Sequence, residues 1–151
     1  MTGKPRPTVL AISSFVAHGH VGLSAILPIS QGLGVEVTAL PTILLSNHPA
    51  HRTSASEPVS VARLTAMLTA LDRNGWVAGL DAVLTGYLPT AAHVAFASDA
   101  IALVRARSPG ALICCDPVLG VNPRGLYLPE PVAIAIRDRL QPEAAQITPN
   151  R

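Results

Sequence analysis

The chain has 151 residues, of which 49% are hydrophobic and 13% charged, and its formal net charge is +2. This length and composition exclude an intrinsically disordered chain and predict one globular domain with a buried core. Scattered Lys and Arg residues and an aromatic content of only 3% argue against nucleic-acid binding. No apolar run approaches the roughly 20 residues needed to cross a membrane.

Strand and helix patterns alternate along the chain. Short runs that are apolar on both faces predict buried strands at 8–13, 35–40, 81–86, 111–116 and 145–149. Apolar residues recur at three- and four-residue steps, as in helices, at about 22–33, 61–71, 94–104 and 132–140. The alternation predicts an α/β fold with a parallel sheet of about five strands and helices on both faces.

The loops that follow the predicted strands hold most of the unusual polar residues. In parallel α/β sheets, ligands bind beyond the carboxyl ends of the strands, so we expect the functional site there. The Ser-, Pro- and His-rich segment 46–58 is predicted to be a surface loop or lid.

Cys114 and Cys115 are adjacent in a predicted strand, so their side chains should point to opposite faces of the sheet. Their spacing matches neither a metal site nor a redox motif. Two free thiols indicate a reducing compartment, and we expect the cytoplasm.

Six segments of the chain carry its resemblance to a known family: AISSFVAHGHVG, LSNHP, DAVLTGYL, CCDPVLG, GLYLPE and ITPNR. They occur in the order and at about the spacing found in pyridoxal kinases of the ribokinase-like superfamily, which the chain resembles over essentially its whole length. The resemblance implies a ribokinase-like layered fold with a mostly parallel sheet. It also implies transfer of the ATP γ-phosphoryl group, with Mg²⁺, to the 5′-hydroxyl of pyridoxal, pyridoxine or pyridoxamine, in the salvage of pyridoxal 5′-phosphate.

On the substrate side, the resemblance implies that Ser14 hydrogen-bonds the pyridine ring and that Val21 forms an apolar wall. The residues alone also allow Ser14 to cap a turn and Val21 to belong to the core. Gly19 and Gly22 permit a tight turn here. Tyr87 follows a predicted strand, where its flat ring could line a pyridine pocket or form part of the core.

The segment LSNHPAH contains a departure from the family. Pro49 replaces a Thr that is common there, and it offers neither a hydroxyl nor a backbone N–H. Pro49 and Ala50 are carried over as substrate-binding positions through backbone carbonyls or apolar contact.

Four histidines also raise the hypothesis of a zinc site, because paired imidazoles are common zinc ligands. They are His18, His20, His48 and His51. Their spacing is not a standard zinc pattern, which favours two polar loop pairs instead.

On the phosphate side, Asp116 ends a predicted strand before Pro117. The resemblance implies that its carboxylate faces the ATP phosphates and contacts Mg²⁺ indirectly, whereas the residue type alone would also suit a turn cap. Thr148 and Asn150 match residues near the nucleotide phosphates. Many family members carry a further acid where this chain has Val121.

The chain contains no Gly-x-Gly-Asp sequence, the segment that supplies the anion hole and catalytic base in ribokinase-like enzymes. We therefore expect 1–151 to be a truncated ribokinase-like domain that lacks the C-terminal ATP-binding and catalytic-base portion. No catalytic residue is assigned within it, and by itself the chain is predicted to be inactive.

Two alternatives remain beside a pyridoxal kinase. The chain could bind B6 vitamers, or pair with a kinase subunit, without catalysis. It could also be a relative of the hydroxymethylpyrimidine kinases, although GHVG, SNH and GLYLPE favour the pyridoxal branch. Because family members are homodimers, we also expect self-association.

Overall fold

Strands and helices alternate along the computed structural model, which describes residues 6–121 and 125–149. The first elements are β1 (Thr8–His18), α1 (Leu23–Gly32), β2 (Glu36–Asn47), β3 (Ser56–Pro58), α2 (Val61–Arg73), β4 (Ala82–Thr85) and α3 (Ala91–Arg107). They are followed by β5 (Leu112–Cys115), β6 (Gly120–Val121), β7 (Gly125–Leu126), α4 (Glu130–Ala135), the π-helical turn η1 (Ile136–Leu140), the 3-10 turn η2 (Gln141–Glu143) and β8 (Gln146–Ile147).

The main sheet has six strands in the order β3-β2-β1-β4-β5-β8. Strands β2, β1, β4, β5 and β8 are parallel to their neighbours, and β3 is antiparallel to β2 at one edge. The predicted α/β fold with about five parallel strands is therefore confirmed. The antiparallel edge strand and the small hairpin of β6 and β7 were not predicted.

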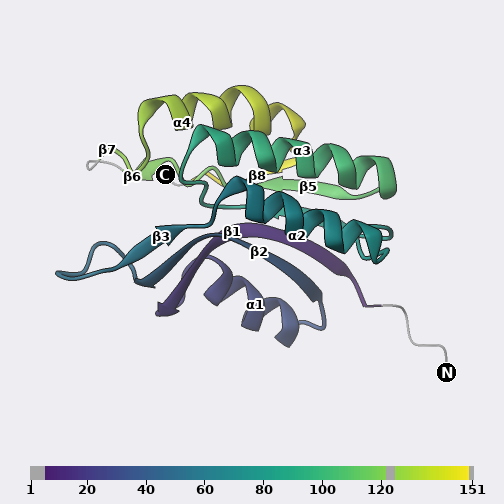
Figure 1. The fold of residues 1–151 in the computed structure, drawn as a ribbon, viewed down its shortest axis with the longest axis horizontal. Helices are drawn as coiled ribbons and strands as arrows, with labels where there is room; N and C mark the ends of the chain where they lie inside the picture. The colour runs from purple at the N-terminus through teal and green to yellow at the C-terminus, as the bar shows by residue number, and fades with distance from the viewer. Residues whose placement is uncertain (1–5, 122–124, 150–151) are drawn as a thin grey trace.

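Helices cover both faces of this sheet, in three layers (Figure 1). Helix α1 packs on β1 and β2 from one side, while α2, α3 and α4 lie side by side on the other. Between these three helices and the sheet lies the main core, whose largest fully buried side chains include Leu10, Ile12, Leu40, Leu64, Leu88, Ile101, Ile136 and Leu140. The four predicted helices are all present, and the fourth continues through η1 to η2.

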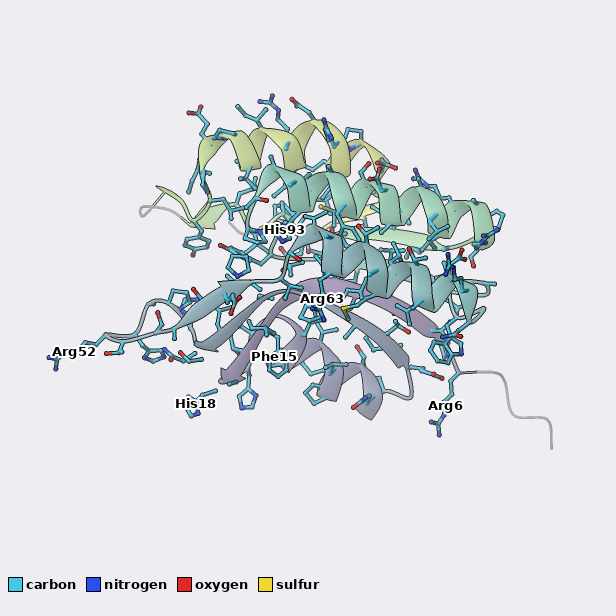
Figure 2. The ribbon with its side chains drawn as sticks, viewed as in Figure 1. Arg6, Phe15, His18, Arg52, Arg63 and His93 are labelled. Atoms are coloured by element: carbon cyan, nitrogen blue, oxygen red, sulfur yellow. The ribbon has the colours of Figure 1, made fainter. Side chains whose placement is uncertain are left out.

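The segment predicted as a surface loop is in part a hairpin. Strand β2 runs to Asn47 and pairs with β3, so that the connection projects from the body of the molecule with Arg52 near its end (Figure 2). Hydrogen bonds hold the base of this connection: the Ser46 N–H donates to the Ala55 carbonyl, and the Ala55 N–H donates to Ser46 Oγ. The hydrogen bonds of Ser46 thus extend the pairing of β2 and β3 in a segment where no alternation of apolar residues had indicated a strand.

Candidate functional site

Candidate residues lie at or just beyond the carboxyl ends of neighbouring strands of the sheet. Tyr87 follows β4, Asp116 follows β5 and Thr148 follows β8, whereas Ser14 lies within β1, which continues to His18, beyond the end predicted at residue 13. Ser14 is two residues beyond Ile12, the last residue of β1 that pairs with β4. The Asp116 N–H donates to the Thr85 carbonyl (2.8 Å) and the Thr148 N–H to the Cys115 carbonyl (3.0 Å), so both continue the ladder. Parallel strands are about 4.8 Å apart, which sets the ends of β1 and β5 roughly 10 Å from each other.

The turn from β1 to α1 folds back against the strand. The pairing of β1 with β2 shifts register between Ser13 and Phe15, and Phe15 forms an antiparallel bridge with Gly22. Gly22 has φ +55° and ψ −137°, a conformation essentially restricted to glycine, and a Cβ there would collide with the carbonyl oxygen and Oγ of Ser14. Ser14 is consequently buried, whereas Val21, on the turn, is 40% exposed. The expected glycine-dependent turn is present.

Tyr87 is half-buried beside this turn. Its ring packs against a small apolar cluster, Val16, Ile43 and Leu45, that the ends of β1 and β2 provide. Burial raises the pKa of the Tyr87 phenol above its ordinary value, so the hydroxyl is a neutral donor at physiological pH. Tyr87 also packs against the main core, so the core contact is observed, and the role of its ring in a pyridine pocket stays a prediction.

Pro49 and Ala50 are exposed in the connection between β2 and β3. Asn47 is paired with His18, so this connection begins beside the end of β1. The Ala50 N–H donates to His48 Nδ1 (3.1 Å), and Pro49 has no N–H, so the backbone carbonyls are the polar groups that these two residues can offer to a ligand.

The zinc hypothesis finds no support in the described part of the chain. No group of three or more His, Cys, Asp or Glu side chains there could hold a metal ion. His18, His20, His48 and His51 are exposed loop or strand-end residues, in line with the simpler interpretation of polar loop pairs.

Asp116 has an unusual environment for a carboxylate. Burial raises the pKa of its side chain, and a 3.3 Å hydrogen bond from the Val118 N–H to Oδ1 only partly offsets this effect. None of the ion pairs among the described residues involves Asp116. Val118 has φ +42°, which costs a β-branched residue about 1–3 kcal/mol. A half-buried acid without a cation, beside a strained turn, is typical of a ligand site.

The remaining phosphate-side positions are described only in part. Thr148 is exposed after β8. Asn150 and the side chain of Val121 lie outside the described residues.

The two cysteines point to opposite faces, as predicted: Cys115 is buried and Cys114 is partly exposed. Both are free thiols. Burial raises the pKa of the Cys115 thiol, and the nearby Asp116 charge adds to this effect, so Cys115 is not an activated nucleophile.

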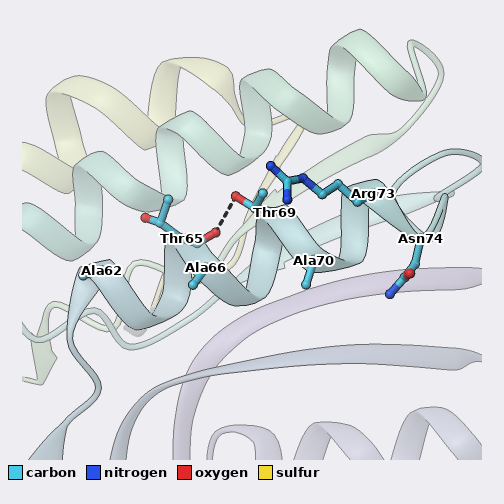
Figure 3. Close-up of a pocket in the computed structure, with 7 residues that line it drawn as sticks. All are labelled: Ala62, Thr65, Ala66, Thr69, Ala70, Arg73 and Asn74. Atoms are coloured by element: carbon cyan, nitrogen blue, oxygen red, sulfur yellow. Dashed lines mark hydrogen bonds between the residues drawn. The ribbon is translucent and has the colours of Figure 1, made fainter.

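A separate groove runs along the outer face of α2 (Figure 3). Its lining residues all come from this helix and the residue that follows it: Ala62, Thr65, Ala66, Thr69, Ala70, Arg73 and Asn74. The groove contains no acid and no nucleophile activated by a neighbouring base. It therefore offers less chemistry than the carboxyl ends of the strands.

Comparisons with known proteins agree with the expected resemblance, although no family model matches the chain. A curated pyridoxal kinase of Granulibacter bethesdensis is 38% identical over 144 residues, which are 95% of this chain and 50% of that protein. A structure of Leishmania donovani pyridoxal kinase with ADP and pyridoxamine has a TM-score of 0.88 at 32% identity, covering 95% of this chain and 51% of that one.

A structure from Bacteroides thetaiotaomicron, described as a putative phosphomethylpyrimidine kinase, has a TM-score of 0.87 at 30% identity and covers 99% of this chain and 50% of that one. The chain thus spans about half the length of the relatives it matches. The resemblance to pyridoxal kinases and the ribokinase-like fold are confirmed. No helix among the described residues is long and apolar enough to span a membrane.

Two residues beside the site were not identified from the sequence. Ser13 and Thr42 are buried polar residues within β1 and β2, and both hydrogen-bond the backbone of Tyr87. A hydroxyl residue within a largely apolar run was the only signal that could have indicated them.

Proposed function

We propose that this chain provides the B6-vitamer side and part of the phosphate side of a pyridoxal kinase site. The reaction transfers the γ-phosphoryl group of ATP to the 5′-hydroxyl of pyridoxal or a related vitamer. The observation that carries the proposal is that Ser14, Tyr87, Asp116 and Thr148 lie at the same end of the sheet, where the carboxyl ends of β4, β5 and β8 meet. Further support is that a relative with this fold was solved with ADP and pyridoxamine.

On the vitamer side, Ser14 Oγ would hydrogen-bond the pyridine ring, and Tyr87 and Val21 would cover its faces. The Ser14 hydroxyl can donate and accept, which suits a ring nitrogen in either protonation state. Pro49 and Ala50 would close over the substrate from the hairpin connection.

On the phosphate side, Asp116 would stand near the nucleotide phosphates, with Thr148 and Asn150. Its half-buried carboxylate, which forms no ion pair with a described residue, fits an indirect contact with Mg²⁺, and one acid does not provide a full coordination shell. When bound, Mg²⁺ neutralises charge on the transferring phosphoryl group.

Within these 151 residues no group is assigned as the base for the attacking hydroxyl, and no Gly-x-Gly-Asp segment is present to form an anion hole. General-base assistance contributes about 10²–10⁴ in rate, and each lost anion-hole donor removes about 10²–10³. We therefore propose that the 151-residue chain binds B6 vitamers and does not turn over by itself.

Phosphorylation of a hydroxymethylpyrimidine is the second candidate, and the match to the Bacteroides thetaiotaomicron structure favours it. Both substrates are small aromatic rings that carry a hydroxymethyl group, so the fold does not distinguish them. The affinities of this chain for the two compounds would distinguish them.

Two further features complete the proposal. Self-association as a homodimer is expected from the resemblance. A cytoplasmic location agrees with free Cys114 and Cys115.

The test combines an activity assay with a binding titration. Purified protein would be incubated with Mg-ATP and pyridoxal while pyridoxal 5′-phosphate is followed, and pyridoxal and hydroxymethylpyrimidine would be titrated separately by calorimetry. We expect binding of pyridoxal that Ser14→Ala weakens, and no turnover above the background of an Asp116→Asn control. Robust phosphorylation that Asp116→Asn abolishes would contradict the proposed inactivity, and tighter binding of the pyrimidine would favour the second candidate.

A further inference from the structure

The backbone of Tyr87 is held by two side chains from two different strands. The Tyr87 N–H donates to Ser13 Oγ of β1 (3.3 Å), and the Tyr87 carbonyl accepts a hydrogen bond from Thr42 Oγ1 of β2 (2.7 Å). Ser13 is 2% exposed and Thr42 is fully buried. Both hydrogen bonds are therefore shielded from water, where losing one partner is costly.

The contact from Thr42 crosses the sheet. Strand β1 lies between β2 and β4, so Thr42 reaches over β1 to a residue that follows β4. Thr42 lies in an irregular stretch of the β1–β2 pairing: Ser13 is opposite Pro41 and Phe15 is opposite Leu44, so β2 has one residue more than β1 between these two pairs. The loop after β4 consequently lies over the ends of β1 and β2, and this brings the Tyr87 ring onto Val16, Ile43 and Leu45.

Gly86 makes this arrangement possible. The Gly86 N–H donates to the Ile12 carbonyl (2.9 Å), which continues the pairing of β4 with β1. The next N–H along the chain, that of Tyr87, donates to Ser13 Oγ instead of to a backbone carbonyl. A Cβ on Gly86 would collide with Ser13 Oγ. Only glycine at this position leaves the Ser13 hydroxyl in reach of Tyr87.

We propose that Ser13 and Thr42 are positioning residues that fix the backbone of Tyr87, and so hold its ring in place to receive the pyridine ring of a B6 vitamer. This inference rests on the proposed function, because that function puts Tyr87 against the substrate. Neither hydroxyl contacts the substrate. They act by removing the freedom of the loop after β4, so that less ordering is required when the vitamer binds.

The test has one readout without ligand and one with it. The chain contains only two tyrosines, Tyr87 and Tyr127, so protein labelled with ¹³C at tyrosine Cζ gives two resonances, which Tyr127→Phe assigns. Thr42→Val keeps the shape and removes the hydroxyl. We expect it to shift or broaden the Tyr87 resonance and to weaken pyridoxal binding about three- to tenfold.

Matched variants separate positioning from general destabilisation. Thr42→Ser retains a hydroxyl and should restore both readouts. Ser13→Ala removes the acceptor of the Tyr87 N–H, and it should reproduce the effects of Thr42→Val. Thr69→Val is the control. The Thr69 hydroxyl also donates to a backbone carbonyl, that of Thr65 (2.8 Å), but at an exposed position of α2 that does not contact Tyr87 through this hydrogen bond. It should change neither readout.

The outcomes distinguish this inference from the function on which it rests. An unchanged Tyr87 resonance and unchanged pyridoxal affinity in both Thr42→Val and Ser13→Ala would overturn the positioning role. If the unsubstituted chain bound no pyridoxal while the Tyr87 resonance still responded to Thr42→Val, the proposed function would fail and the backbone restraint would stand.

Discussion

The turn that buries Ser14 requires glycine at position 22, because the backbone there adopts a positive φ. Gly22→Ala would impose an unfavourable φ and a collision with Ser14, whereas Gly34, with φ +79°, has open space around the corresponding Cβ position. We expect Gly34→Ala to lower the free energy of unfolding by about 1 kcal/mol and Gly22→Ala by at least about 2 kcal/mol. Urea unfolding of the two variants measures the difference, and equal effects would argue against the collision.

Asp116 is expected to make stability fall as pH rises. Burial raises the pKa of this acid in the folded state, so the unfolded chain ionises first, near 3.8, and folding is disfavoured from there upward through the folded-state pKa. Asp116→Asn removes that effect and should raise the melting temperature at pH 7 but not below pH 3.8.

Asp72 supplies a control of opposite sign. Hydrogen bonds from Arg107 hold the pKa of the Asp72 carboxyl below its usual value, so its contribution is present above about pH 3.8 and is lost as pH falls through the folded-state pKa. Asp72→Asn should therefore lower the melting temperature at pH 7. Shifts of the same sign for both variants would refute the assigned environments.

At the scale of elements, Ser108 joins α3 to the segment that precedes β4. Ser108 Oγ accepts from the N–H groups of Gly79 (2.8 Å) and Leu80 (3.1 Å) and donates to the Val77 carbonyl (3.1 Å). Ser108→Ala leaves these buried groups without that partner, so we expect a loss of about 2–4 kcal/mol in the free energy of unfolding. Ser54→Ala, at an exposed position, is the control for denaturant unfolding, and a loss below 1 kcal/mol at Ser108 would contradict the assignment.

The elements also mark where sequence reasoning succeeded and where it failed. Apolar runs identified all five parallel strands, because strands covered by helices on both faces need apolar side chains on both faces. Strand β3 has no such pattern: its three residues are exposed and pair with β2 through the backbone. The positive φ of Val118 was likewise not predictable, since valine disfavours it.

The same contrast applies to the site. The alternation of strand and helix patterns predicted that Tyr87, Asp116 and Thr148 follow the carboxyl ends of their strands, and the structure agrees. The support beneath Tyr87 was missed, because Thr42 lies where β2 has one residue more than β1 in their pairing, and no sequence pattern indicates that irregularity.

At the scale of the whole molecule, apolar surface remains uncovered. Helix α1 packs on β1 and β2, and Ile29 of this helix is exposed, as is Leu33 directly after it. Leu112 of β5 and Ile147 of β8 are also exposed. Exposed apolar surface and an open sheet edge promote association. We expect light scattering to give a mass above the 15.7 kDa of one chain, and Ile29→Gln with Leu33→Gln to reduce it. A sharp monomer for the unsubstituted chain would contradict this expectation.

Amide chemical-shift mapping with pyridoxal is the direct test of whether β1 and the end of β4 bind a B6 vitamer, as we propose. In ¹⁵N-labelled protein, pyridoxal should shift the amides of Ser14, Val21 and Tyr87 in proportion to the fraction bound. Shifts confined to the groove on α2, at Ala66 and Ala70, or no shifts at saturating pyridoxal, would contradict the account.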